Sequence, residues 1–162
     1  MTLLSHYFTL FLLVFVLTCS AQDFIQITSP TNGQTVSSKS QLTISYNVIG
    51  VPIVSPPPAN ATYPSGMTAE FQWLQKGTTN NPLSLNASNS LVTKPYVAGI
   101  QNKAYTSVWN IPNCHFFSRY TPSNYNFQMV FTPTYNIPSD QNQQSIVVPL
   151  TIQVNNATFP KC

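Results

Sequence analysis

The segment Gln41-Leu42-Thr43-Ile44-Ser45-Tyr46-Asn47-Val48 decides the fold, because polar and apolar side chains alternate along it without interruption. A period of two places its apolar residues on one face of a β-strand and its polar residues on the other. We find no stretch of convincing helical period elsewhere in the sequence. The sequence therefore predicts a protein built from strands that are each buried on one face.

Further segments show the same alternation and are separated by Pro, Asn, Ser and Gly. The expected strands cover residues 24–28, 67–73, 83–85, 91–92, 105–111, 125–131 and 145–154, of which 83–85 and 91–92 are the least regular. Pro149 lies inside the last strand and indicates an edge position or a bulge, because proline cannot donate a ladder hydrogen bond. About seven short strands with this punctuation predict an all-β, antiparallel sandwich.

The prolines between Gly50 and Gly66, among them Pro56-Pro57-Pro58, predict a connection without strands in that part of the chain. The last three strands are expected to run along the sandwich, back, and along it again. Residues 105–111 and 145–154 should therefore finish at the same end of the molecule.

Residues 1–21 have the pattern of a signal peptide. An apolar run from Phe8 to Leu17 precedes the small-residue site Thr18-Cys19-Ser20-Ala21, and this run is too short for a good membrane span. The remaining residues, 22–162, are expected to form a single secreted β-sandwich domain located outside the cell or in a cell wall. An uncleaved signal anchor is the alternative, because no Lys or Arg precedes the apolar run.

The composition indicates a folded domain with a polar but weakly charged surface. Charged residues make up 6% of the chain, whereas 12% are aromatic and 43% hydrophobic. We expect such a chain to fold and to expose a surface of Ser, Thr, Asn and Gln. Surfaces of this kind are common in extracellular proteins found among polysaccharides. The net charge of +3 is scattered along the chain, so nucleic acid is not an expected partner.

Two cysteines remain once Cys19 leaves with the signal peptide. An even pair in an oxidising compartment predicts a disulfide between Cys114 and Cys162, which follow strands that finish at the same end. The bond would close a loop of about 50 residues and stabilise the fold by about 4 kcal/mol in the loop-entropy model. Two free thiols, or a bond between chains, are the alternatives.

Three sequons follow the signal peptide. Asn60-Ala61-Thr62, Asn86-Ala87-Ser88 and Asn156-Ala157-Thr158 each fit Asn-x-Ser/Thr without an intervening proline. They predict N-glycosylation at Asn60, Asn86 and Asn156.

The sequence contains few residues that could act in catalysis or bind a metal. Asp23, Glu70 and Asp140 are the only carboxylate side chains, and glycoside hydrolysis normally needs a pair of them. His115 is the one histidine of the mature chain, has no G-x-S-x-G phrase to accompany it, and is expected in a loop. One histidine and a bridged cysteine pair make no tetrahedral metal set. We therefore expect no enzyme, no metal and no cofactor.

Aromatic residues are the remaining candidates for ligand contact. Those in strand register are expected in the core: Phe71, Trp73, Trp109, Tyr125, Phe127 and Phe131. Four tyrosines in the connections could form a surface platform on which sugar rings stack, although a loop tyrosine often only covers a core. They are Tyr63, Tyr96, Tyr120 and Tyr135.

Several phrases resemble one fungal family. The opening Ile25-Gln26-Ile27-Thr28-Ser29-Pro30-Thr31-Asn32-Gly33, then Trp109-Asn110-Ile111-Pro112, Tyr125-Asn126-Phe127-Gln128-Met129 and Leu150-Thr151-Ile152, are similar in order to the N-terminal domain of the yeast cell-wall-synthesis proteins. The resemblance implies an immunoglobulin- or fibronectin-III-like sandwich, secretion, and a wall or matrix role for which β-glucan assembly has been proposed. It brings no catalytic residues. Unlike members with a Ser/Thr-rich stalk and a glycolipid anchor, this chain shows neither, so no membrane anchor is expected.

These observations predict a noncatalytic secreted protein of the cell wall or extracellular matrix. Its expected partner is a wall polysaccharide of the β-glucan type, which it binds or helps to assemble, or a matrix protein. The alternative is a secreted effector or adhesin that binds a host or partner protein through the proline-rich connection.

Overall fold

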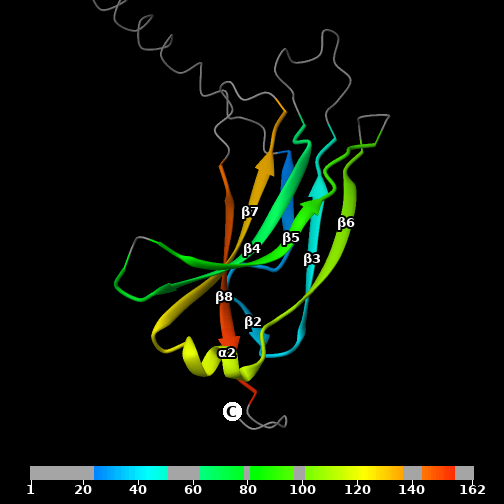
Figure 1. The fold of residues 1–162 in the computed structure, drawn as a ribbon. Coiled ribbons are helices and arrows are strands. Elements are labelled where there is room, and N and C mark those ends of the chain that lie inside the picture. Colours follow the sequence, from blue (N-terminus) through cyan, green and yellow to red (C-terminus); the bar gives the residue numbers. More distant parts are fainter. Residues whose placement is uncertain (1–23, 51–62, 79–80, 97–100, 137–143, 156–162) are drawn as a thin grey trace, which may run out of the picture.

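Two β-sheets of unequal size make up the part of the chain that the computed structural model describes, residues 24–50, 63–78, 81–96, 101–136 and 144–155 (Figure 1). The smaller sheet has the order β1-β3-β6 and contains β1 (Ile25–Ser29), β3 (Gln41–Val48) and β6 (Lys103–Asn110). The larger sheet has the order β2-β8-β7-β4-β5 and contains β2 (Gln34–Ser37), β8 (Ile146–Gln153), β7 (Tyr125–Thr134), β4 (Gly66–Gln75) and β5 (Leu83–Leu91). All pairs are antiparallel except β2 with β8, which is parallel.

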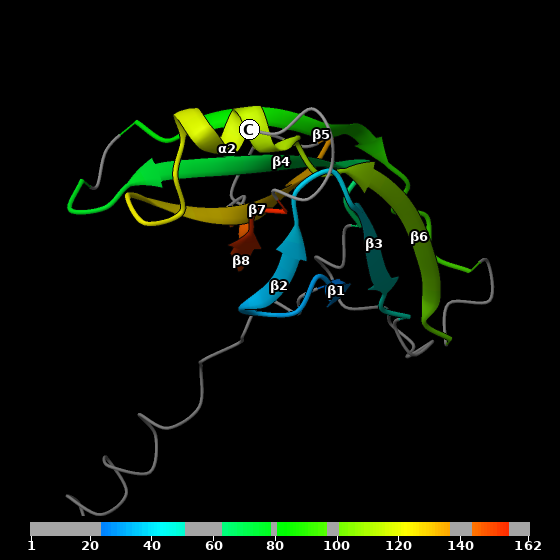
Figure 2. The ribbon, with the colours of Figure 1, turned by 90° about the horizontal axis from the view of Figure 1, so that it is seen from below.

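The all-β sandwich expected from the sequence is confirmed, with eight strands in the described residues. Figure 2 shows β4, β5 and β7 on one side and β1, β3 and β6 on the other. The apolar faces of the two layers meet between them, since every apolar residue of β3 is at most 2% exposed.

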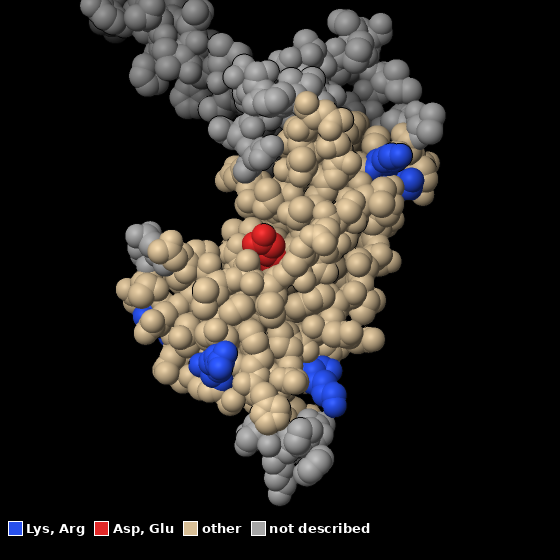
Figure 3. Space-filling model, viewed as in Figure 1, with Lys and Arg blue, Asp and Glu red and all other residues tan. Residues whose placement is uncertain are grey.

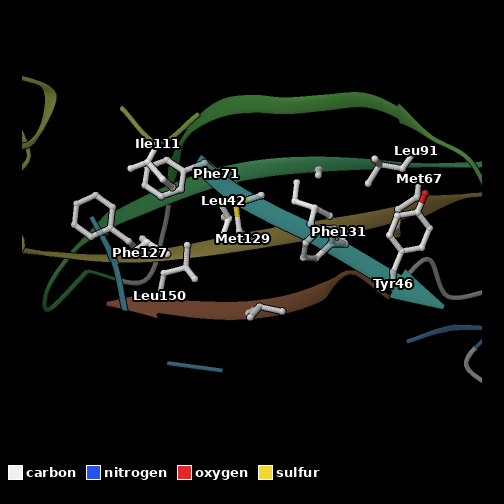
Figure 4. Close-up of a cluster of buried hydrophobic side chains, with 14 of the residues drawn as sticks. Leu42, Tyr46, Met67, Phe71, Leu91, Ile111, Phe127, Met129, Phe131 and Leu150 are labelled. Atoms are coloured by element: carbon white, nitrogen blue, oxygen red, sulfur yellow. The ribbon is translucent and has the colours of Figure 1, made fainter. Parts of the chain in front are cut away.

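The core between the sheets is rich in aromatic and sulfur-containing side chains (Figure 4). Phe71, Met129 and Phe131 are fully buried, and Phe71 contacts the rings of Trp109 and Phe127 at centroid distances of 5.1 and 5.7 Å. Alternation in β4 and β7 therefore produces the buried face as the sequence predicts. Of the six aromatic residues expected in the core, four are buried and two are half-buried against it, the latter being Trp109 and Tyr125.

Strand β5 differs from expectation. The segments 83–85 and 91–92 were expected to be separate, but Leu83–Leu91 is one continuous strand at the edge of the larger sheet. Its pairing with β4 shifts in register near Ala69, which breaks the alternation that would have revealed it. Leu83 and Leu85, at the start of this edge strand, are 48% and 39% exposed, whereas Leu91 at its end is buried in the core.

Pro149 lies in β8, which pairs with β7 on one side and β2 on the other, so β8 as a whole is not an edge strand. The ladder with β2 starts only at Leu150. The Gly33 N–H donates to the Pro149 carbonyl at 2.9 Å, so this carbonyl points away from β7. The N–H and C=O of a strand residue point to the same side, and the N–H that proline lacks therefore removes no hydrogen bond to β7. The expected edge position is therefore correct only for the first half of the strand.

One helix, α2 (Cys114–Arg119), lies at the end of the sandwich where β4, β6 and β8 finish, which we call the α2 end. The turn between β2 and β3 joins the segments that leave β6 and β8 at this end. Lys39 N–H donates to the Pro112 carbonyl after β6, and Ser38 N–H donates to the Gln153 carbonyl at the end of β8, both at 2.9 Å. The common finishing end predicted for residues 105–111 and 145–154 is thus observed. The loop predicted around His115 is wrong, since His115 belongs to this helix.

Candidate functional site

The helix α2 forms from a short local signal in the sequence, which shows no clear helical period. Asn113 caps its start, and the Asn113 side chain accepts a hydrogen bond from the Phe116 N–H at 3.2 Å. Phe116, Phe117 and Tyr120 recur at helical spacing, which directs their rings to one side of a single turn. The cap and this spacing are the local signals for the helix in the sequence, but six residues are too few for a periodic pattern to stand out.

An aromatic cluster fixes the helix to the larger sheet. The Trp73 ring lies 4.9 Å from both the Phe116 and the Tyr120 rings, and Tyr120 meets Tyr125 edge-on at 5.4 Å. Phe117 is fully buried beneath the helix. Tyr120 and Phe116 are half-buried, so each has one part against the core and another at the surface.

A shallow, open hollow lies on the outside of this cluster. It encloses about 550 Å³ and is lined by His115, Phe116, Ser118, Arg119 and Tyr120. Within the described residues, the Arg119 guanidinium has no ion pair and the Tyr120 hydroxyl has no hydrogen-bond partner. The hollow therefore offers a ligand an aromatic face, together with a hydroxyl and a cation that no described residue engages.

A buried donor lies directly beneath the hollow. The Trp73 indole Nε1 is buried and has no hydrogen-bond partner in the described part of the chain. A buried polar group without a partner costs about 1–3 kcal/mol. Trp73 touches Phe116 and Tyr120, both of which line the hollow, so its emission would respond to changes there.

Basic residues lie at both ends of the sandwich, since Lys94 and Lys103 lie at the end opposite to α2. Lys39 and Lys76 also lie at the α2 end, where Lys76 N–H donates to the Asn124 carbonyl at 2.8 Å beside the start of β7. Glu70 is the only carboxylate in the described ranges, and Figure 3 shows it as a single red side chain in the middle of the face it presents. Among the described residues, the α2 end therefore carries three basic side chains, Lys39, Lys76 and Arg119, and the opposite end carries two.

The four tyrosines predicted as a platform do not come together. Tyr63, Tyr96 and Tyr135 lie at the opposite end of the sandwich, where β3 and β7 finish and β4 and β6 begin. Tyr63 is half-buried and donates to the Ile49 carbonyl at 2.7 Å, while Tyr96 is 47% exposed beneath the Lys103 ammonium. Only Tyr120 lies at the α2 end and lines a hollow.

Two further tyrosines, which are not among the four candidates from the sequence, form a stacked pair at the opposite end. Tyr46 and Tyr105 are register partners in β3 and β6, and their rings stack at 5.5 Å. Their hydroxyls donate to the carbonyls of Val92 and Lys94, at 2.8 and 2.7 Å. Burial, and to a lesser degree the neighbouring Tyr105, raises the pKa of Tyr46 to about 12, although the hydrogen bond to Val92 acts in the other direction.

Glu70 lies on the outer face of the larger sheet, between the buried residues Ala69 and Phe71 of β4. The Gln72 amide donates to the Glu70 carboxylate at 2.9 Å, and the Gln128 amide donates to Gln72 at 3.3 Å. No cluster of three or more His, Cys, Asp or Glu residues that could hold a metal occurs in the described residues. Asp23 and Asp140 fall outside these residues.

The predicted covalent sites are described only in part. Cys114 is buried and disulfide-bonded, while Cys162 lies outside the described residues, so their pairing stays a prediction. Asn86 is exposed on β5, whereas Asn60 and Asn156 also lie outside the described ranges. No helix in the described part is long and apolar enough to cross a membrane, and the proposed signal peptide is not part of it.

The fold and the hollow together define a β-sandwich domain with an aromatic and cationic recess at one end. Comparison with models of protein families and with curated proteins gives no match. The similarity to the fungal cell-wall family therefore rests on the short phrases quoted above.

Proposed function

We propose that the protein is a secreted, N-glycosylated and noncatalytic component of a cell wall or extracellular matrix that binds polysaccharide through the α2 end. The proposal rests on the position of Tyr120. Its half-buried ring packs on Trp73 and lines the hollow, and its hydroxyl has no partner among the described residues.

Sugars are recognised by this combination of groups. The C–H faces of a pyranose ring stack on exposed aromatic rings, and sugar hydroxyls bond to hydroxyl and charged groups. Tyr120 and Phe116 supply the rings, while Ser118, His115 and Arg119 supply polar groups around them. The weakly charged surface of the chain and its sequons support the same extracellular environment.

The test is a sedimentation assay on insoluble β-glucan, chitin and mannan with the mature, deglycosylated protein. We expect retention on one polymer and an approximately fivefold loss of affinity in Tyr120→Leu, which keeps apolar packing against Trp73 but removes the aromatic face. Tyr96→Leu is the matched control, because Tyr96 is an exposed tyrosine at the opposite end. It should bind as the unchanged protein does.

The other outcomes are informative as well. Weaker binding in Tyr96→Leu alone would move the site to the opposite end of the sandwich. Retention on none of the polymers would contradict polysaccharide binding and favour the alternative, an effector or adhesin. That role would then be tested by a pull-down for one stoichiometric protein partner.

A further inference from the structure

We infer that the outer face of the larger sheet is the docking surface for the chain's own glycan at Asn86. The inference goes beyond the α2 end and rests on the N-glycosylation proposed above. It starts from the position of Asn86, which is exposed in the middle of the edge strand β5 and is the register partner of Glu70 in β4.

Register pairing defines a row of side chains that runs inward from Asn86. Glu70 pairs with Asn86 on one side and with Val130 in β7 on the other, and Val130 pairs with Val147 in β8. Val130 is only 7% exposed, so the side chains of the row that a glycan can contact are Glu70 and Val147. Directly paired residues point to the same face, with Cβ atoms about 5 Å apart. Three strand spacings of about 4.8 Å give the row a length of about 14 Å, enough for the first sugars of an N-glycan.

The chemistry along the row suits a sugar chain. Glu70 accepts from Gln72 through one carboxylate oxygen, and its other oxygen has no partner in the described residues. The Gln72 and Gln128 amides lie along the next row, where they can bond to hydroxyl or acetamido groups. At the far end Val147 is 50% exposed and offers methyl groups to the apolar face of a ring.

The attachment atom has a hydrogen-bond partner in the folded domain. The Asn86 Nδ2 donates to the Asn89 side-chain oxygen. An N-glycosylated asparagine retains one N–H on this nitrogen, so the same bond can persist and limit rotation of the linkage. An attached glycan also has a high effective concentration over the face, which favours contacts that a free sugar would make only weakly.

The experiment measures how fast a peptide N-glycosidase releases each glycan from the native, full-length secreted protein. Release converts asparagine to aspartate, so mass spectrometry of peptides follows Asn60, Asn86 and Asn156 separately in one sample. A glycan that lies on the sheet must detach from it before cleavage, and we expect release at Asn86 to be about tenfold slower than at the other two sites.

Two variants test whether the row causes the protection. Glu70→Ala and Val147→Ser should each accelerate release at Asn86 and leave Asn60 and Asn156 unchanged. Asn126→Ala is the matched control, because Asn126 is exposed on the same sheet but pairs with Leu74, two rows from Glu70. All three are surface changes whose folding is checked by their thermal midpoints.

Several results would overturn the inference. Equal release at all three sites would show that the Asn86 glycan extends into solvent. Slow release at Asn86 that both Glu70→Ala and Val147→Ser leave unaltered would reflect the strand position of the linkage and not the row. A secreted protein without a glycan at Asn86 would remove the inference outright.

Discussion

The two ends of the sandwich use tyrosine in different ways. At the opposite end, Tyr46, Tyr63 and Tyr105 each donate a hydrogen bond from the hydroxyl to a backbone carbonyl of a neighbouring segment. At the α2 end, Tyr120 packs its ring on Trp73, while its hydroxyl has no partner among the described residues. The first three tyrosines stabilise the fold through their hydroxyls, whereas no described residue occupies the Tyr120 hydroxyl, which can bond to a ligand.

The comparison shows why residue type alone does not identify a binding platform. A tyrosine near a strand end can close the sandwich or face a ligand, and the two roles differ in the partner of its hydroxyl. That partner can belong to a segment far away in the chain: Tyr46 donates to the carbonyl of Val92, at a sequence separation of 46.

The largest expected effect concerns the disulfide at the α2 end. Cys114→Ser combined with Cys162→Ser should lower the free energy of unfolding by about 4 kcal/mol if the two cysteines pair, because their bond closes a loop of about 50 residues. Urea unfolding of the variant and the parent protein measures the difference. A single Cys114→Ser change with no loss of stability would contradict the pairing.

The next effect separates the two kinds of tyrosine. Tyr46→Phe keeps the buried ring but leaves the Val92 carbonyl without its donor, so it should cost about 1–2 kcal/mol. Tyr120→Phe should change the free energy of unfolding by less than about 0.5 kcal/mol, since the Tyr120 hydroxyl makes no hydrogen bond with any described residue. Chemical denaturation measures both, and a larger loss in Tyr120→Phe would show that Tyr120 is also structural.

The last effect appears only at alkaline pH, at the opposite end. The Tyr46 pKa is raised from 10.0 to about 12 in the folded state, so the unfolded chain loses its proton first as the pH rises. The stability that Tyr46 contributes is therefore fully present below pH 10 and is lost as the pH rises from 10 towards 12. Denaturation midpoints across this range should fall more steeply in the parent protein than in Tyr46→Phe, and parallel curves would contradict the assignment.

Alternation predicted most of the fold. The pattern in residues 41–48, 67–73 and 125–131 gave the right strands and the right buried faces, because a strand buried on one side leaves a period of two in the sequence. β5 was predicted only as fragments, since a register shift interrupts its pattern and much of it is exposed on both faces. The division into three and five strands depends on long-range pairing that no local segment encodes.

The candidate site was predicted only in part. Tyr120 was a candidate, but Phe116, Ser118 and Arg119 were not, because they gather around it only through a one-turn helix. Trp73 was correctly expected in the core, yet its contact with the hollow follows from where that helix packs. The row from Asn86 to Val147 joins three register pairs and becomes visible only once the strand order is known.

The scarcity of carboxylates has a consequence for the medium that the protein can tolerate. Acid denaturation proceeds mainly through carboxylates that must take up protons when the native state is lost. Only three side chains of that kind occur in 162 residues, and the core is held by aromatic and aliphatic packing. The fold thus takes up few protons as its surroundings acidify, and we expect its free energy of unfolding to change little as the pH falls.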